Sequence, residues 1–243
     1  MLIGAGGAIC DDRDMTVVIA HRGASRAEPE NTIAAFRRAV EMGAEGIELD
    51  VRRTVDDALV VHHDAVLDDG RVIRHTASTE LPDHVPSLSA ALDACAGAFV
   101  NVEIKNSPSE PDFDPSDWVA HRTVIELGAR GADQRWLVSS FRLATVDTVR
   151  RLAPGVRTAW LVVGAGPEQL TATVAARHVA IHPYVDALDA DVVRAAHAAG
   201  LAVNTWTCDD PERMRQLIAW GIDGICTNVP DVALAVRHEA LRS

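Results

Sequence analysis

Two acidic residues, Glu48 and Asp50, stand two positions apart within the apolar segment Gly46–Val51. Side chains alternate between the two faces of a β-strand, so both carboxylates point to one face and the apolar residues to the other. The carboxylates then lie about 6–7 Å apart along the strand, and they repel each other unless a cation lies between them. A solvated strand face would give the same pattern, but the apolar residues on both sides indicate a buried segment.

A third acid, Glu103, lies in another apolar segment, two positions before Lys105. Together with Glu48 and Asp50 it would make an all-oxygen site of the kind that Mg²⁺ or Ca²⁺ prefers. No cluster of cysteine and histidine in the sequence indicates zinc. Lys105 is the only lysine among 23 basic residues, which marks it as unusual. The alternative is that Glu103 and Lys105 only neutralise each other.

Two histidine-containing pairs, His21-Arg22 and His62-His63, each follow an apolar segment. Imidazole titrates near neutral pH, which makes His21 and His63 candidates for general base and general acid. Arg22 and Lys105 suit a phosphate, because a guanidinium binds it bidentately and an ammonium acts as a point charge. Neighbouring side chains on an extended chain face opposite ways, so only one of His62 and His63 can face the site. We interpret His62 as structural, as a lone histidine at a strand end more often is. A metal, two cations and two histidines around one cavity describe phosphodiester cleavage better than any other reaction class.

Other residues that could take part in a reaction lie in less specific sequence contexts. Trp206 ends a further apolar segment, where we expect it either to pack at the rim of the site or also to contact the substrate. The remaining histidines show no comparable setting and are interpreted as structural: His75, His84, His121, His178, His182, His197 and His238.

The elements that must position these residues alternate along the whole chain. Short apolar segments predict eight strands, at residues 16–20, 46–51, 99–104, 136–139, 157–163, 179–182, 202–206 and 224–227. Amphipathic segments predict the helices between them, at residues 32–42, 88–94, 118–127, 143–152, 168–176, 191–199, 212–220 and 231–238. Asn31 is expected to cap the first helix.

This α/β alternation predicts a parallel sheet, and eight units predict closure into a (β/α)8 TIM barrel. The alternative, an open doubly wound sheet, is disfavoured because no glycine-rich dinucleotide loop follows the first strand. In such a barrel the chemistry lies at the C-terminal strand ends, which is where the polar residues fall. A further apolar segment at residues 59–62 predicts a short insertion after the second strand. We interpret residues 1–243 as a single domain of the usual size for this fold.

Composition excludes several classes of partner. The net charge of −12 and the absence of a basic stripe argue against nucleic acid and against a polybasic membrane-surface patch. Residues 1–10 lack a basic leader and are too short to span a bilayer, so neither a signal peptide nor stable membrane insertion is expected. No pattern indicates an oligomeric state. The four cysteines are scattered and predict a reduced, cytoplasmic protein: Cys10, Cys95, Cys208 and Cys226.

Taken in order, these motifs resemble the glycerophosphodiester phosphodiesterases, a TIM-barrel branch of the phospholipase-C-like phosphodiesterases. The resemblance covers nearly the whole chain, and the ordered set is highly specific. The matching motifs are His21-Arg22-Gly23, Pro29-Glu30-Asn31-Thr32, Glu48-Leu49-Asp50-Val51 with Thr54 and Asp56, His63-Asp64, Glu103-Ile104-Lys105, Ser139-Ser140-Phe141, Trp206-Thr207 and Asp223-Gly224-Ile225-Cys226-Thr227-Asn228-Val229-Pro230.

The resemblance implies a hydrolase of lipid metabolism that cleaves a small-molecule glycerophosphodiester to glycerol 3-phosphate and an alcohol. It also implies one divalent cation, Mg²⁺ or Ca²⁺. Carried across by position, the metal ligands would be Glu48, Asp50 and Glu103. The acid–base pair would be His21 and His63, and the phosphate would be held by Arg22 and Lys105. The resemblance does not assign the two histidine roles; we assign His21 as base and His63 as acid.

Two features depart from the family pattern. After His63-Asp64 the family usually carries a longer insertion, rich in arginine and threonine, that roofs the substrate. Here residues 67–86 lead quickly to the next helix, so the roof is abbreviated. Asn228 stands where the family often has aspartate.

Two alternative functions remain on this fold: a lysophospholipase D-type phosphodiesterase and a non-catalytic barrel that binds phosphate esters.

Overall fold

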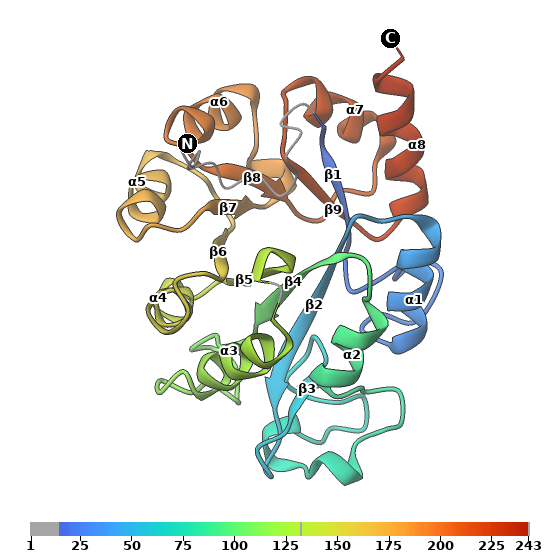
Figure 1. Cartoon of the computed structure of the whole chain (residues 1–243), viewed down its shortest axis with the longest axis vertical. Helices are drawn as coiled ribbons and strands as arrows, with labels where there is room; N and C mark the ends of the chain where they lie inside the picture. Colours follow the sequence, from blue (N-terminus) through green and yellow to red (C-terminus); the bar gives the residue numbers. More distant parts are fainter. Residues whose placement is uncertain (1–14, 132, 243) are drawn as a thin grey trace.

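The computed structural model describes residues 15–131 and 133–242, so Cys10 and the predicted absence of a signal peptide lie outside the described residues. The parallel strands are β1 (Val17–Ala20), β2 (Gly46–Arg53), β4 (Phe99–Ile104), β5 (Trp136–Ser140), β6 (Arg157–Val162), β7 (Ala180–Pro183), β8 (Ala202–Thr205) and β9 (Gly224–Thr227). Because β1 pairs with both β2 and β9, these strands close into a barrel (Figure 1). The predicted TIM barrel is confirmed.

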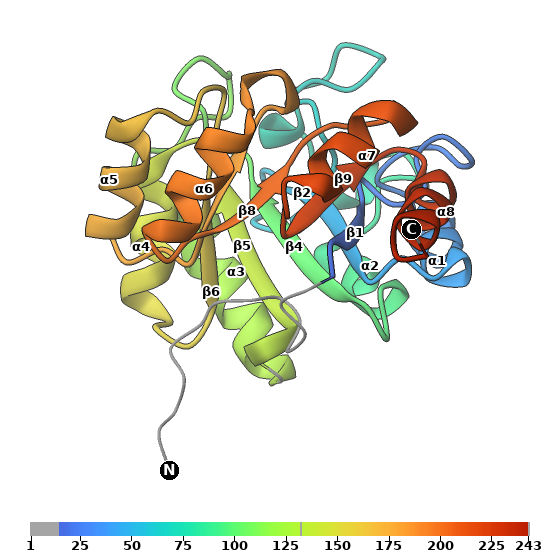
Figure 2. The same cartoon turned by 90° about the horizontal axis from the view of Figure 1, so that it is seen from above.

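Helices follow the strands and cover the outside of the barrel (Figures 1 and 2). They are α1 (Ile33–Met42), α2 (Leu88–Ala94), α3 (Trp118–Arg130), α4 (Leu143–Leu152), α5 (Pro167–Ala175), α6 (Ala190–Ala198), α7 (Pro211–Ala219) and α8 (Pro230–Ala240). None of these helices is long and apolar enough to cross a lipid bilayer.

The strand alternation inferred from the sequence explains how the barrel is packed. Ile47 and Leu49 of β2 are completely buried in one cluster with Phe36 of α1 and Leu92 of α2. Burying each such side chain contributes about 1.5–3 kcal/mol. The residues between the apolar ones, such as Glu48, are thereby directed into the barrel.

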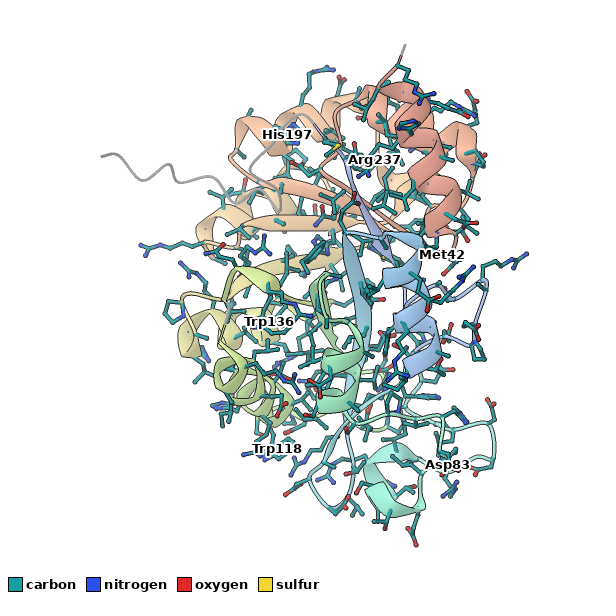
Figure 3. The ribbon with its side chains drawn as sticks, turned by 45° about the vertical axis from the view of Figure 1, so that its right-hand side comes forward. Met42, Asp83, Trp118, Trp136, His197 and Arg237 are labelled. Carbon is teal, nitrogen blue, oxygen red and sulfur yellow. The ribbon has the colours of Figure 1, made fainter. Side chains whose placement is uncertain are left out.

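The insertion after the second barrel strand is a small hairpin-based unit. The strand β3 (Leu59–Val61) runs antiparallel to the end of β2. Two short 3-10 turns follow, η1 (Ile73–His75) and η2 (Ser78–Glu80), and the unit has its own cluster of Val60, Leu67 and Ile73. Asp83 lies in this insertion at one end of the molecule (Figure 3). The insertion and the loop between β4 and α3 rise on the same side of the barrel (Figure 2).

Three local predictions need correction. Asn31 does not cap the first helix; the cap is Thr32, whose hydroxyl accepts from the amide of Ala35 at 3.2 Å. The helix expected to end near Gly128 continues to Arg130, because one glycine inside a helix costs only about 1 kcal/mol. Trp206 lies just beyond β8 rather than within it. The other predicted helices and barrel strands agree with the structure to within two residues at each end.

Candidate active site

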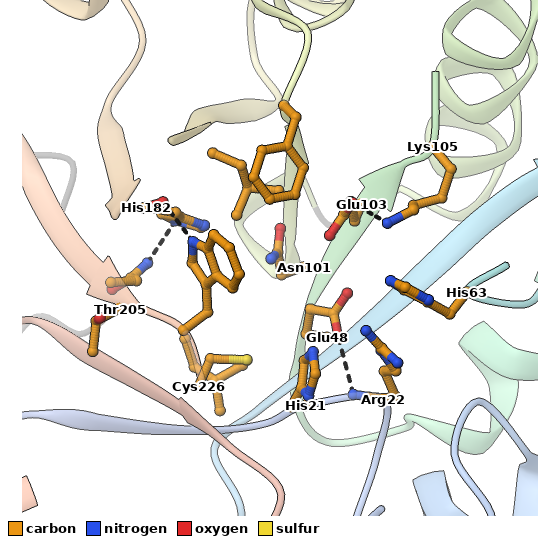
Figure 4. A pocket seen from close by; sticks show the side chains of 15 residues that line it. His21, Arg22, Glu48, His63, Asn101, Glu103, Lys105, His182, Thr205 and Cys226 are labelled. Atoms are coloured by element: carbon orange, nitrogen blue, oxygen red, sulfur yellow. Dashed lines mark hydrogen bonds and ion pairs between the residues drawn. The ribbon is translucent and has the colours of Figure 1, made fainter. Parts of the chain in front are cut away.

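A cavity of about 500 Å³ opens at the C-terminal ends of the barrel strands (Figure 4). Seven of the eight residues that the sequence singled out line it: His21, Arg22, Glu48, His63, Glu103, Lys105 and Trp206. The eighth, Asp50, is only 1% exposed and lies against them, bonded to Asn31. Residues from five parts of the chain therefore converge at one mouth of the barrel.

The three acids form one buried cluster. Asp50 of β2 is the register partner of Glu103 on β4, and carboxylate oxygens of Glu48, Asp50 and Glu103 lie within 4.8 Å of one another. Burial raises the pKa of Glu48 well above its usual range, and the charges of Asp50 and Glu103 raise it further. Burial likewise raises the pKa of Glu103. The cluster is therefore short of positive charge.

The donor set fits a hard divalent cation. Two of its oxygens, Oε1 of Glu48 and Oδ1 of Asp50, are buried and have no hydrogen-bond partner among the residues described. An ion that binds oxygens at about 2.3–2.6 Å, as Ca²⁺ does, fits between atoms this close together, and Mg²⁺ takes the same ligand type at shorter distances. Unpaired buried carboxylate oxygens are costly, so a ligand that pairs them is expected.

Asp50 differs from its neighbours because two cations face it. Burial alone would raise its pKa, but Lys105 and Arg22 outweigh burial and lower the pKa of Asp50 to about 2. Lys105 Nζ lies 3.6 Å from Asp50 Oδ1 and donates to Glu103 Oε1 at 2.8 Å. The Nδ2 group of Asn31 also donates to Asp50 Oδ2, at 2.8 Å. Asn31, which was expected to cap a helix, thus holds a site carboxylate.

The main chain around Arg22 is shaped for the site. Its φ of 57° is in the left-handed region, and its amide donates to Oε2 of Glu48 at 2.9 Å. The next residue, Gly23, has φ of 83°, and a Cβ there would lie 2.6 Å from the main chain of Ala35, so only glycine fits. The guanidinium is held by Glu30 at 2.8 Å. Arg22 is therefore fixed at the cavity by both its main chain and its side chain.

His21 is oriented by a chain of hydrogen bonds that starts at Asp209. Asn228 Nδ2 donates to Asp209 Oδ2 at 2.7 Å, which leaves Asn228 Oδ1 facing His21 Nδ1 at 2.7 Å. Because that oxygen can only accept, Nδ1 carries the hydrogen and Nε2 is left as an acceptor. Burial, together with the charge of Arg22, lowers the pKa of His21. Both effects favour the neutral form of the imidazole.

His63 has a carboxylate partner instead. Its Nδ1 lies 2.7 Å from Oδ1 of Asp64, which favours the charged ring, although burial lowers the pKa of His63 overall. His62 points elsewhere, with its Nδ1 at 2.9 Å from the carbonyl oxygen of Asp64. Of the two adjacent histidines only His63 lines the cavity, as the alternation of side chains predicts.

Aromatic side chains form another part of the cavity wall. The ring of Trp206 meets that of Phe141 edge to face, with centroids 5.2 Å apart, and lies 5.3 Å from the ring of Tyr184. Trp206 Nε1 donates to the carbonyl oxygen of His182 at 2.8 Å. Trp206 thus packs at the rim and lines the cavity, and its contact with the substrate stays a prediction.

The sequence interpretation missed several polar residues beneath the rim. His182, predicted to be only structural, lines the cavity and is 4% exposed; burial lowers its pKa to about 3. Its Nε2 lies 2.9 Å from Nδ2 of Asn204. Asn101 and Asn204 line the same cavity, and Figure 4 shows Asn101 and His182 among its lining side chains. Each lies at an inward-facing strand position, and this two-residue period was the signal that would have found them.

Comparison with known proteins points to one family. Residues 21–232 match the glycerophosphoryl diester phosphodiesterase family. A glycerophosphodiester phosphodiesterase of Caldanaerobacter subterraneus subsp. tengcongensis is 29% identical over 239 residues, which cover 90% of this chain and 96% of the relative. A probable glycerophosphodiester phosphodiesterase 1 of Mycobacterium tuberculosis is 32% identical over 246 residues, which cover 88% of this chain and 89% of the relative.

Solved structures agree. A glycerophosphodiester phosphodiesterase from Parabacteroides distasonis matches with a TM-score of 0.81 and 27% identity, covering 92% of this chain and 97% of that one. An Oleispira antarctica phosphodiesterase, solved with the product sn-glycerol-3-phosphate, matches with a TM-score of 0.84 and covers 94% of this chain and 98% of that one. At 24% identity the second match shows the fold.

Proposed function

This chain belongs to the glycerophosphoryl diester phosphodiesterase family, and on that premise we propose that it hydrolyses a glycerophosphodiester to glycerol 3-phosphate and an alcohol. The observation that carries the proposal is the convergence of two histidines, three acids and two cations on one cavity at the C-terminal mouth of the barrel. The names of the relatives support it, and so does the Oleispira phosphodiesterase bound to sn-glycerol-3-phosphate, a product of this reaction.

We propose that Glu48, Asp50 and Glu103 hold one divalent cation, Mg²⁺ or Ca²⁺. The buried oxygens of Glu48 and Asp50 that have no hydrogen bond support this, as does the raised pKa of Glu48. When bound, such a cation polarises a phosphoryl oxygen and offsets charge that develops in the transition state.

Arg22 and Lys105 are proposed to bind the phosphate. Both are cations at the cavity, and both are held by acids, Glu30 and Glu103 respectively. Held cations cost little reorganisation when charge develops on the phosphoryl oxygens, which is the main source of electrostatic catalysis.

The histidines are proposed to move the protons. Nε2 of His21 takes a proton from the attacking water as its oxygen bonds to phosphorus. The bond from phosphorus to the alcohol oxygen breaks, and His63 gives its proton to that oxygen. The hydrogen bond from His21 Nδ1 to Asn228 supports the base role, and the contact of His63 with the Asp64 carboxylate supports the acid role. Proton exchange with solvent then restores both rings.

Chelation tests this proposal directly. Exhaustive chelation should abolish release of glycerol 3-phosphate from glycerophosphocholine, and added Mg²⁺ or Ca²⁺ should restore it. Activity that survives chelation would reject the metal role. Tight binding of glycerophosphodiesters without any product, across a panel of alcohols and metals, would favour a non-catalytic barrel instead.

One observation favours a second candidate, a phosphodiesterase of the lysophospholipase D type. Phe141, Val163 and Tyr184, in the loops after the adjacent strands β5, β6 and β7, are 40%, 66% and 37% exposed. An apolar rim of this kind suits an acyl chain beside the phosphate. Turnover of lysophosphatidylcholine and glycerophosphocholine, measured side by side, decides between the two substrates.

We also propose that the chain works as one domain in the reducing cytoplasm. Cys95, Cys208 and Cys226 are buried free thiols, which supports a reduced protein. Burial raises the pKa of Cys95 to about 12 and that of Cys208 to about 11, so both stay protonated.

A further inference from the structure

Arg52 is completely buried, alone among the arginines of the described ranges, and it lies outside every motif discussed above. It stands on β2, two positions after Asp50, and its guanidinium bonds to the main chain of His63. Nε donates to the His63 carbonyl oxygen at 2.9 Å, and Nη2 donates to the same oxygen.

His63 needs such support because it lies beyond the barrel. Apart from one main-chain bond, from the His62 amide to the Asp50 carbonyl oxygen at 3.0 Å, the ladder between β2 and β3 ends where Val51 pairs with Val61. His63 follows two residues later, in the insertion, whereas His21 directly follows a barrel strand. A planar guanidinium that places two N–H groups on one carbonyl oxygen fixes both the position and the direction of that peptide.

The charge of Arg52 is balanced by two acids in the loop between β4 and α3. Nη1 lies 2.5 Å from Oδ2 of Asp112, and Nη2 lies 2.9 Å from Oε1 of Glu110. Burial alone would lower the pKa of Arg52, but these acids outweigh it and raise the pKa, so the cation persists. Buried ion pairs are often no more stabilising than apolar residues of the same volume. A role in placing His63 therefore explains this cluster better than stability does.

We propose that Arg52 is a positioning residue for the reaction: it holds the main chain of His63 so that the imidazole reaches the leaving-group oxygen. The inference rests on the proposed function and on His63 as the general acid. Arg52 is fully enclosed, so it acts through His63 and does not contact the substrate.

The test compares Arg52→Lys with Arg53→Lys. Lysine keeps the charge at position 52 but loses the planar fork. Arg53 is the neighbouring arginine on the opposite strand face, paired with Asp57 and Asp114. With glycerophosphocholine, we expect Arg52→Lys to lower kcat about 10- to 100-fold with KM little changed, and Arg53→Lys to stay close to wild type. Equal losses in both variants would overturn the inference.

The leaving group separates positioning of the acid from a general structural effect. A p-nitrophenyl phosphodiester releases a stable phenolate and needs little help from an acid, whereas choline needs a proton. The loss in Arg52→Lys should therefore be large for glycerophosphocholine and small for the p-nitrophenyl substrate. The same loss on both substrates contradicts a role through His63.

A double-mutant cycle asks whether Arg52 acts through His63. In a His63→Ala background, Arg52→Lys should have almost no further effect on kcat, because the group that it positions is gone. A further loss as large as that in the wild-type background rules the inference out.

One readout does not depend on turnover. In NMR spectra of the histidine rings, Arg52→Lys should shift the signals of His63 and leave those of His21 in place. Unchanged signals of the His63 ring overturn the inference.

If wild type hydrolyses no glycerophosphodiester, the proposed function fails, and this spectrum still decides the positioning role. If Arg52→Lys does not fold, the triple variant Arg52→Met, Glu110→Gln, Asp112→Asn, which removes the charges as a set, replaces it.

Discussion

His21 and Asn228 are 207 positions apart in the chain, and their side chains meet with 2.7 Å between Nδ1 and Oδ1. An amide oxygen fixes the tautomer of the ring without adding charge, whereas a carboxylate in its place stabilises the imidazolium. The residue at position 228 therefore contributes to the pKa of the proposed base, beside the larger effects of burial and Arg22.

Asn228→Asp is expected to raise the pKa of His21. The base must be neutral to take a proton, so the acidic limb of the pH profile of kcat/KM should move to higher pH. In wild type that limb should lie below the ordinary histidine value, because burial and Arg22 lower the pKa of His21. Ser25→Ala removes another hydrogen bond to Asn228 without changing charge and should leave the limb in place. An acidic limb that does not move in Asn228→Asp removes His21 from the base role.

His63→Ala is expected to lower kcat by about 10²–10⁴-fold, the usual contribution of one general acid, without loss of the fold. His62→Ala is the matched control, because His62 is the adjacent residue and its ring faces the carbonyl oxygen of Asp64, 2.9 Å from Nδ1, and is not part of the cavity lining. Steady-state kinetics and circular dichroism on both variants check the expectation. Full turnover in His63→Ala would contradict the mechanism.

A divalent cation is expected to raise Tm. At a hundredfold excess over Kd, binding adds about 2.7 kcal/mol, or roughly 5–10 °C for a chain of this size. Glu48→Gln should lose most of that shift, whereas Glu41→Gln, on the exposed face of α1, should keep it. Scanning calorimetry in EDTA, Mg²⁺ and Ca²⁺ measures the shifts. Equal shifts in wild type and Glu48→Gln would place the ion elsewhere.

Without a metal, the buried charge of Glu48 should lower the stability of the folded protein at neutral pH. The pKa of Glu48 is raised in the folded state, so its contribution to stability is present below the ordinary value of 4.5 and is lost as pH rises through the folded pKa. In EDTA at neutral pH, Glu48→Gln should therefore melt at a higher temperature than wild type. A lower Tm would show that Glu48 stabilises the fold without a cation.

Burial of His182 should make stability depend on pH in the direction opposite to that expected for Glu48. Burial lowers its pKa from 6.5 to about 3, so the folded state prefers the neutral ring. Its contribution to stability is present above pH 6.5 and is lost as pH falls toward 3, with a slope of up to about 1.4 kcal/mol per pH unit. The difference in unfolding free energy between wild type and His182→Gln, measured by urea titration, should change across that window. A constant difference would show that His182 does not titrate on unfolding.

Local patterns were enough to predict the barrel and most of the residues that meet at its C-terminal rim. The shared face of Glu48 and Asp50 follows from strand geometry alone, and so does the expectation that only one of His62 and His63 faces the site. Parallel strands in a barrel end at a common rim, so residues at strand ends converge even when their distances cannot be foreseen. That is why seven of the eight expected residues line one cavity.

The partners of those residues were decided by the tertiary structure. Asn31 satisfies the local rule for a helix cap, yet closure of the barrel brings Asp50 within 2.8 Å of it, and Thr32 takes the cap. Arg52 bonds to His63 across a hairpin, and Asn228 reaches His21 only because β9 pairs with β1. A residue type limits which hydrogen bonds are possible, but the bond that forms depends on which groups the closed barrel places within about 3 Å.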